Sequence, residues 1–410
     1  MIQINRHLFD NGIRLVHSRD AMTHMVGLDF LYDVGSRDEV EGKTGLAHLV
    51  EHLMFSGSAN AHNFDAALQA AGGISNGGTG ADTTCYYEIL PAQNIETAFW
   101  LESDRLMKPD FNPKHVDLQR NVVLEEFKQN YLNSPYGDVG MLINKSAYTV
   151  HPYRHSAIGD SFDEVASLTA DDVERFFYSH YAPQNLVIAV TGNVDFDSVV
   201  ELIERWFGSI PRRDVSMRSL PMEPKQTSFR QFCFKKTVPD DLIIELYHTC
   251  SRTHKDFYAI DLISDVLSNG TSSRLIRMVL NSHLFTSVGA VITGTVDPGL
   301  MIIEGKSAPG VSVDRACEAL KSEIDGLLLK NGISAEELQR CVNKREAEIC
   351  FESMSYLEKA KNLASMELIS MDLNLEIAKY RSVTVDDVNR VANEIFTDDN
   401  RTELIYGPDA

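Results

Sequence analysis

The sequence of 410 residues contains no apolar run that approaches the roughly 20 residues a membrane-spanning helix needs. It also lacks a basic N-terminal region followed by an apolar stretch. No signal peptide is therefore visible, and we expect a cytoplasmic protein, or a periplasmic one if a leader has been lost. Basic side chains are few: 38 Lys and Arg stand against 59 Asp and Glu, a formal net charge of −21. This deficit argues against a nucleic-acid partner, because phosphates require a basic footprint.

Cysteine is scarce as well. The six cysteines are scattered without a C-x-x-C pair, so we interpret them as mostly reduced and buried, and as neither zinc ligands nor a disulfide framework. No G-x-G-x-x-G or Walker sequence is present, which argues against a nucleotide-binding fold. The chain is too long for one ordinary core, and its hydrophobic share of 43% is typical of a globular protein. We therefore expect at least two domains.

The chain does contain an internal repeat. The motif Thr-x-Asp-Asp at residues 169–172 recurs at 384–387, and Gly192 recurs as Gly407, each with an offset of 215 residues. In both copies the motif predicts a helix N-cap, followed by a helix and then a strand. The chain is therefore expected to consist of two related halves.

A segment rich in proline and polar residues, 213–225, separates the two copies and is interpreted as a linker. We predict an α+β fold in which residues 1–212 and 226–410 form homologous, α/β-sandwich-like halves. Each half is expected to hold an antiparallel-rich sheet covered by helices. Amphipathic patterns predict helices at 116–132, 170–179, 198–207, 257–268, 313–329, 334–350, 357–371 and 384–396.

The most informative stretch is an apolar run over residues 46–54 that contains His48, Glu51 and His52. In a helix the two histidines lie one turn apart on one face, with Glu51 beside them. Three titratable groups on the inner face of an apolar helix are costly unless they share a task. Two neutral imidazoles suit zinc, and a neighbouring carboxylate can take the proton of a water that the metal activates. The alternative is a set of satisfied core or surface residues.

A third ligand is expected on the helix that carries the sequence R-N-V-V-L-E-E. There Glu126 lies on the same face as Val122 and Phe127, which would place its carboxylate on the apolar side. Gln119 lies two turns earlier on that face. Glu125, set about 100° away, is the alternative ligand. A solvated pair of glutamates at the edge of the helix is the alternative to any ligand.

Residues 45–57 resemble the pitrilysin/insulinase-type zinc metallopeptidases, most closely their mitochondrial-processing-peptidase-like branch. The inverted motif H-x-x-E-H carries the resemblance. It extends over nearly the whole chain through residues 72–87, 120–126, 151–159 and 181–192. The resemblance implies a zinc metalloendopeptidase that hydrolyses peptides or unfolded presequence-like segments inside a chamber. It also implies one Zn²⁺ per chain and two homologous halves, of which only one binds zinc.

Carried onto this sequence, the resemblance implies that His48, His52 and Glu126 bind zinc. It implies that Glu51 is the general base, which takes a proton from the attacking water and passes it to the leaving amine. Gln119 stands where the family usually has a glutamate that supports the site from behind the ligands. An amide can still form hydrogen bonds there, but it adds no negative charge.

The resemblance also implies a substrate strand over residues 76–86. A peptide would bind by adding to the edge of a sheet, with Asn76, Thr79 and Asp82 among the residues that hold it. Turn chemistry in a glycine-rich hairpin is the alternative role for Asn76 and Asp82.

The second half departs from the pattern of active family members, which have an arginine followed seven residues later by a tyrosine. Here Val279 and Thr286 stand at those positions. We therefore expect a homodimer, or a heterodimer with a zinc-free paralogue that supplies the missing pair. A non-catalytic structural or peptide-binding subunit of the same fold is the alternative function.

Overall fold

The computed structural model describes residues 2–215 and 218–409, with the side chains at 327–329 excepted. The chain forms two compact units. Unit 1 consists of Met1–Asn133, His155–Pro221 and Cys350–Asn374, and unit 2 consists of Ser134–Arg154, Met222–Ile349 and Leu375–Ala410. The predicted halves 1–212 and 226–410 describe the two copies of the repeat, whereas each compact unit also takes a segment from the other copy. Residues 216 and 217 of the predicted linker lie outside the described residues.

Unit 1 is built on a six-stranded sheet. Strands β2 and β6 are parallel, and the other neighbours are antiparallel. Strands β3 and β6 lie in the centre and are buried on both faces, whereas β4 forms an edge. The order across the sheet is β1 (Asn5–Leu8), β2 (Arg14–Arg19), β6 (Leu186–Gly192), β3 (Met25–Tyr32), β5 (Thr84–Pro91) and β4 (Ile74–Thr79).

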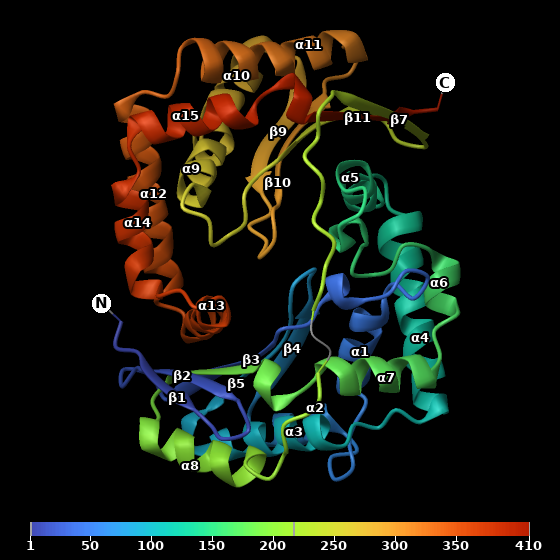
Figure 1. Ribbon diagram of the computed structural model, residues 1–410, viewed down its shortest axis with the longest axis vertical. Helices are drawn as coiled ribbons and strands as arrows, with labels where there is room; N and C mark the ends of the chain where they lie inside the picture. The colour runs from blue at the N-terminus through green and yellow to red at the C-terminus, as the bar shows by residue number, and fades with distance from the viewer. Residues whose placement is uncertain (1, 216–217, 410) are drawn as a thin grey trace. The chain divides into compact units, whose positions relative to one another are not determined.

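Helices cover both faces of the unit 1 sheet. Helices α3 (Ile95–Met107) and α8 (Phe196–Phe207) lie along one face, and α13 (Tyr356–Leu368) lies along the other (Figure 1). The remaining helices of unit 1 are α1 (Leu46–Met54), α2 (Phe64–Ala70), α4 (Pro113–Phe127), α6 (Phe162–Ala166) and α7 (Ala170–His180), with short turns η1 (Ser36–Asp38), η2 (Ala92–Asn94), η3 (Lys128–Leu132) and η5 (Pro183–Asn185).

Unit 2 repeats this topology on a five-stranded sheet. Its strand order is β7 (Arg230–Lys236), β11 (Arg401–Pro408), β8 (Leu242–His248), β10 (Leu300–Ser307) and β9 (Phe285–Ile292). As in β2-β6-β3-β5-β4 of unit 1, the first two strands are parallel and the others antiparallel. Its helices are α5 (Val139–Ala147), α9 (Phe257–Ser268), α10 (Arg274–Ser282), α11 (Val313–Ile324), α12 (Ala335–Glu352), α14 (Glu376–Ser382) and α15 (Val385–Ile395), with turns η4 (Pro152–Arg154), η6 (Asp325–Lys330) and η8 (Asp398–Asn400).

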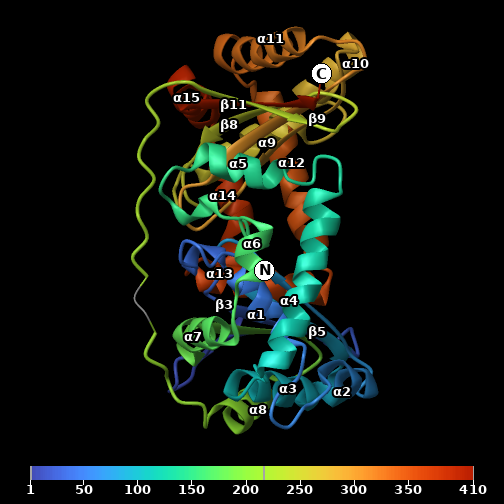
Figure 2. The same cartoon turned by 90° about the vertical axis from the view of Figure 1, so that its right-hand side faces the viewer.

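The two halves exchange one helix each. Helix α5 follows α4 of the first half but belongs to unit 2, where it packs on β8 and β11. Figure 2 shows α5 on one side of that sheet and α11 on the other. Helix α13 follows α12 of the second half but belongs to unit 1, where it packs on β3 and β6. The exchanged helices occupy corresponding places in the repeat.

The predicted α+β class, with two helix-covered sheets of one topology, is confirmed. The two predicted caps are also present: the hydroxyls of Thr169 and Thr384 accept hydrogen bonds from the N–H groups of Asp172 and Asp387. The helix expected at 116–132 has a regular part of 113–127, followed by a π-helical turn. Among the described helices, none combines the length and the apolar character that a bilayer crossing requires.

Six helices were not predicted: α2, α3, α5, α6, α10 and α14. Helix α3 shows why the pattern was hidden. It buries Glu102, Asp104 and Arg105 together with its apolar residues, so charged side chains interrupt the apolar periodicity on the buried face. Helices α2 and α6 are too short to show a period.

Helix α13 generates a test of the exchange. Leu363 is 2% exposed and packs in the apolar cluster of unit 1 with Leu31, Val187 and Ala189. Leu363→Ala should lower the free energy of unfolding of unit 1 by about 2–5 kcal/mol, because it removes apolar contacts and leaves a cavity. Urea denaturation measures this change. The control is Met354→Ala, since Met354 is 74% exposed; equal stability of the two variants would contradict the packing of α13 on this sheet.

Candidate metal centre

Helix α1 carries His48, Glu51 and His52 and is nine residues long. Its predicted apolar residues are buried, each at most 5% exposed: Leu46, Leu49, Val50, Leu53 and Met54. The helix begins after Gly45, whose backbone has φ +85°, a left-handed conformation that favours glycine. A helix this short is marginal by itself in water, so its surroundings must hold it.

A buried polar side chain holds each end of α1. The Glu39 carboxylate accepts hydrogen bonds from the N–H groups of Gly45 (3.0 Å) and Ala47 (2.7 Å). At the other end the Arg105 guanidinium donates to the carbonyl of Met54 at 3.4 Å. Glu39 is 8% exposed and Arg105 1%. Burial raises the pKa of Glu39 well above its usual range, and the hydrogen bonds from Ala47 and Gly45 oppose this shift. The positive charge of Arg105 at the C-terminus matches the helix dipole.

The structure brings the three predicted zinc ligands together. The Nε2 atoms of His48 and His52 lie 3.8 and 3.4 Å from Oε2 of Glu126. The three ligand atoms lie within 4.8 Å of one another, and they form the one such group among the residues that the structure describes. Ligand atoms around a tetrahedral zinc are about 3.4 Å apart, because each zinc–ligand distance is about 2.0–2.2 Å. The donor set therefore fits zinc in chemistry and in spacing.

The protonation of His48 also suits a ligand. Burial, followed by the neighbouring His52, lowers the pKa of His48 to about 3. The imidazole is therefore neutral at pH 7, which is the form that binds metals. Its Nδ1 is buried and makes no hydrogen bond with the described part of the chain, so Nε2 is the nitrogen with a partner.

Helix α4 places Glu126 at the border of the core. Val116, Val123, Leu124 and Phe127 form its buried face, and the Glu126 side chain is 34% exposed. The expectation that Val122 shares an apolar face with Glu126 was wrong: Val122 is 45% exposed, because Leu124 faces the core instead.

The two other polar residues expected near the metal on α4 have different surroundings. Glu125, the alternative ligand, is 73% exposed and pairs with Lys128 at 2.7 Å, outside the ligand group. Gln119 is half-buried, and its side-chain amide makes no hydrogen bond with any described residue. The supporting role of Gln119 stays a prediction.

Glu51 contacts the edge strand of unit 1. The Thr79 hydroxyl donates to Oε2 of Glu51 at 2.6 Å. A Cβ atom on Gly77 would lie 3.2 Å from Oε1 of Glu51 and 3.1 Å from the ring of Phe55, so a larger residue would crowd the carboxylate. Burial raises the pKa of Glu51, and the hydrogen bond from Thr79 lowers it in part. The edge strand β4 and the carboxylate are therefore fitted to each other.

The other two predicted substrate residues have partners of their own. Asn76 is exposed, and its Oδ1 accepts from the N–H of Gly77 at 2.8 Å, which is turn-like chemistry. Asp82 lies in the turn after β4 and accepts from Arg37 at 2.5 Å. Of Asn76, Thr79 and Asp82, the structure brings only Thr79 to the predicted base.

Comparison with known proteins identifies the family. Residues 14–161 match the family model for Insulinase (Peptidase family M16), and residues 167–345 match that for the Peptidase M16 inactive domain. Zinc protease PqqE of Helicobacter pylori is 30% identical, over 97% of this chain and 91% of its own length. The chain belongs to the insulinase family. The uncharacterized zinc protease YmxG of Bacillus subtilis is 24% identical, over 98% of both chains. The crystal structure of a protease from Helicobacter pylori matches over the whole of both chains, with 27% identity and a TM-score of 0.93.

In unit 2 of this insulinase-family chain, an arginine contacts the residues that align with the predicted zinc-binding histidines of unit 1. Asp261 and Asp265 of α9 align with His48 and His52 when Gly270 is aligned with Gly57. Arg345 of α12 donates to Asp261 at 3.1 Å and to Asp265 at 2.9 Å. The second half thus binds a guanidinium where the first half presents a set of metal ligands.

Neither the arginine nor the tyrosine that the resemblance implied is present at the matching positions of the second half. Val279 is half-buried on α10, and the Thr286 hydroxyl on β9 donates to the carbonyl of Lys306 at 3.3 Å. The nearby Arg274 is held by Glu337 through bonds of 2.8 and 2.7 Å. It is therefore fixed within unit 2 as part of an ion pair.

Sequence reasoning missed three residues that shape the site: Glu39, Arg37 and Arg105. The partners of Arg105 and Arg37 are distant in sequence, since Arg105 is 51 residues from Met54 and Arg37 is 45 residues from Asp82. Glu39 binds the N–H groups of Gly45 and Ala47, 6 and 8 residues further along the chain. One signal was available, because Glu102 and Arg105 stand three residues apart, a spacing that favours an ion pair on a helix.

Asp265 gives a pH-dependent prediction. Burial raises its pKa to about 6, against the opposing effect of Arg345. The folded state then binds this proton more tightly than the unfolded chain does, so the contribution of Asp265 to stability falls as the pH rises from about 4 to about 6. The loss amounts to roughly 3 kcal/mol. Asp265→Asn has no carboxyl group at this position, so its free energy of unfolding should not show this loss. Relative to the variant, the wild type should lose that amount of stability over this pH range.

The measurement is urea denaturation at a series of pH values. The exposed Asp314 provides the control variant Asp314→Asn, whose stability should follow that of the wild type at every pH. If wild type and Asp265→Asn gave parallel stability curves, the raised pKa would be contradicted.

Proposed function

We propose that this chain is a zinc-dependent endopeptidase that hydrolyses peptides or unfolded, presequence-like segments. The observation that carries the proposal is the grouping of His48, His52 and Glu126 on two helices beside Glu51. In this proposal the three residues hold one Zn²⁺. When bound, the ion would polarise the scissile carbonyl and lower the pKa of the attacking water. The names of the relatives, which are zinc proteases, support this metal and this chemistry.

Glu51 is proposed as the general base. Thr79 orients its carboxylate through Oε2, and Oε1 faces the side-chain-free Gly77. Glu51 takes a proton from the attacking water and passes it to the leaving amine. The raised pKa of Glu51 favours the uptake of the proton from the water, because burial disfavours the charged form.

The edge strand β4 is proposed to bind the substrate backbone. Its outer side carries no neighbouring strand of the sheet, and it packs against α1. A peptide that adds to this edge gains main-chain hydrogen bonds with little demand on its sequence. The absence of a side chain at Gly77 would let the peptide approach Glu51.

We infer that the active form is a homodimer, or a heterodimer with a zinc-free paralogue, enclosing the site in a chamber. What supports this is the presence of Val279 and Thr286 where active members have an arginine and a tyrosine. The partner would supply that pair. The alternative is a non-catalytic peptide-binding or structural subunit, for which Glu51 would have no chemical task.

Glu51→Gln tests the reaction. The variant should keep its zinc but lose about 10²–10⁴-fold in peptide cleavage, because the amide cannot accept the proton. Zinc content and cleavage of an unstructured peptide are measured for the chain alone and with any co-encoded paralogue. The exposed Glu41 gives the control Glu41→Gln, which should cleave as the wild type does. Zinc without turnover in every combination would favour the binding subunit, and a zinc-free protein would remove the central claim.

A matched pair of glutamates tests the ligand set. Mutation of a residue that only hydrogen-bonds to a metal ligand typically lowers metal affinity by roughly 10–100-fold. Glu126→Gln should weaken zinc binding by more than this, because it replaces a ligand itself. Glu125→Gln should leave zinc affinity unchanged, because Glu125 lies outside the group. Competition with a chromophoric chelator measures both affinities. The reverse order of effects would make Glu125 the ligand.

A further inference from the structure

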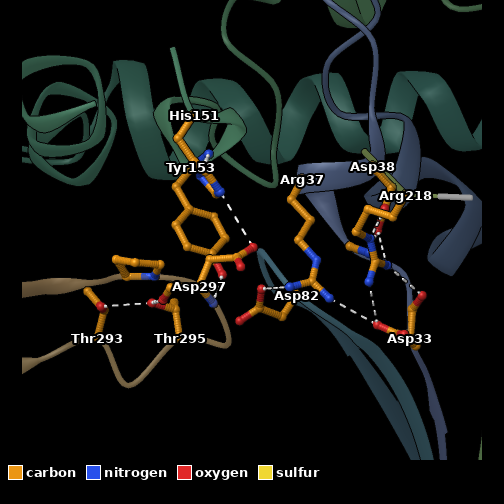
Figure 3. Close-up of polar contacts among 12 residues, drawn as sticks. Asp33, Arg37, Asp38, Asp82, His151, Tyr153, Arg218, Thr293, Thr295 and Asp297 are labelled. Atoms are coloured by element: carbon orange, nitrogen blue, oxygen red, sulfur yellow. Dashed lines mark hydrogen bonds and ion pairs between the residues drawn. The ribbon is translucent and has the colours of Figure 1, made fainter. Parts of the chain in front are cut away.

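A cluster of two arginines and three aspartates in unit 1 holds the turn that follows β4 (Figure 3). We name it the hairpin brace, and it consists of Asp33, Arg37, Asp38, Asp82 and Arg218. None of these residues belongs to the zinc-ligand group. Asp82 was expected to bind substrate, and Arg218 lies in the predicted linker.

The contacts of the brace form one connected network. Arg37 donates to Asp82 at 2.5 Å and to Asp33 at 3.0 Å. Arg218 donates to the same Asp33 oxygen at 3.0 Å and to Asp38 at 2.7 and 3.0 Å. The side chain of Arg37 is 2% exposed and that of Asp82 14%. The Arg37–Asp82 contact is therefore largely buried and charge-assisted, which makes it worth more than an exposed surface pair. Arg218 lies nearer the surface, with its side chain 28% exposed.

The backbone adds two bonds at the same place. The N–H groups of Ser36 and Arg37 donate to the carbonyls of Gly80 (3.1 Å) and Ala81 (3.0 Å). A Cβ atom on Gly35 would lie 2.4 Å from the Ala81 carbonyl oxygen, so only glycine permits this approach. The segment before α1 is thus joined to the turn by hydrogen bonds and by the Arg37–Asp82 ion pair.

The turn connects the brace to Glu51. Thr79 is the last residue of β4 and donates to Glu51, and Gly80 follows it directly. The Gly80 N–H donates to the Thr83 carbonyl at 2.8 Å and closes the turn. The chain of contacts therefore runs from Arg37 through Asp82 and the turn to Thr79 and Glu51.

We propose that Arg37 is a positioning residue, which acts through Asp82 to hold the turn and so places Thr79 against Glu51. Arg218 supports Arg37 through the shared carboxylate of Asp33, which ties the linker to the hairpin that binds substrate. Asp82 then serves the protein's own arginine rather than the peptide. The effect of Arg37 on catalysis rests on the proposed function, whereas its effect on the turn does not.

The test is a double-mutant cycle of Arg37→Met and Asp82→Asn in the zinc-loaded full chain. Hydrogen exchange of the amides at residues 79–83 should accelerate roughly 10-fold or more in each single variant, because each breaks the same charge-assisted bond. The double variant should exchange no faster than the faster single variant, because the effects of a shared contact are not additive. Zinc content should not change.

Steady-state cleavage of an unstructured peptide supplies the second readout. Both single variants should lose a similar factor in kcat/KM, since both release Thr79. If Asp82 bound the substrate directly, Asp82→Asn would raise KM while Arg37→Met left KM unchanged, and the effects would add. Unchanged exchange at 79–83 in Arg37→Met would overturn the proposal.

Three comparisons keep the result interpretable. Arg19→Met, which breaks an exposed ion pair with Asp195 in the same unit, should alter neither readout. If Arg37→Met does not fold, Asp82→Asn and the charge-preserving Arg37→Lys carry the test, and Lys should slow the exchange relative to Asp82→Asn. A wild type that cleaves no peptide, alone or with any co-encoded paralogue, would defeat the proposed function, whereas the exchange measurement would still decide the role of the brace.

Discussion

The candidate site depends on holding a nine-residue helix, α1, at both ends. Its apolar residues bury it against unit 1, but burial alone does not fix its rotation or its position along its own axis. The Glu39 carboxylate and the Arg105 guanidinium do so, because each binds backbone groups that the helix itself leaves without partners. The charge of Arg105 at the C-terminus also matches the helix dipole. His48 and His52 can meet Glu126 of another helix only if that position is kept.

Arg105 can stay charged in the core because its surroundings compensate it. It pairs with Glu102, and its guanidinium lies 4.5 Å from the ring centre of Phe64 and 4.2 Å from that of Tyr86. Burial, followed by the charge of Glu102, raises the pKa of Glu88 well above its usual range, which favours the neutral form of Glu88 beside this pair. Pairing Arg105 with Glu102 limits the cost of burying the two charges. Tyr86 lies opposite Gly77 in the sheet, so the same arginine contacts both the end of α1 and the hairpin next to Glu51.

The sequence was sufficient to predict features that depend on neighbours along the chain. The spacing of His48 and His52 predicted one helical face, and the repeated Thr169 and Thr384 motifs predicted two caps. Contacts between distant residues left no comparable trace: an arginine at position 37 has the same local signature whether or not Asp82 lies beside it. The exchange of α5 and α13 was hidden for the same reason, since an amphipathic pattern shows that a face is buried but not against which sheet. The rotation of α4 could not be fixed either, because Val122 and Leu124 are equally apolar and only tertiary packing decides which one faces the core.

The two halves solve the same electrostatic problem in different ways. In unit 1, the two imidazoles of α1 and the Glu126 carboxylate of α4 form a donor set that fits an external cation. In unit 2, α9 presents Asp261 and Asp265, and Arg345 supplies the cation from within the chain. An internal guanidinium cannot exchange or leave a position open, so unit 2 holds a permanent ion pair where unit 1 presents a group of possible metal ligands. Histidines placed at 261 and 265 of α9 would therefore not create a metal site, because the positive charge of Arg345, still paired with Glu348 at 3.3 Å, would remain beside them.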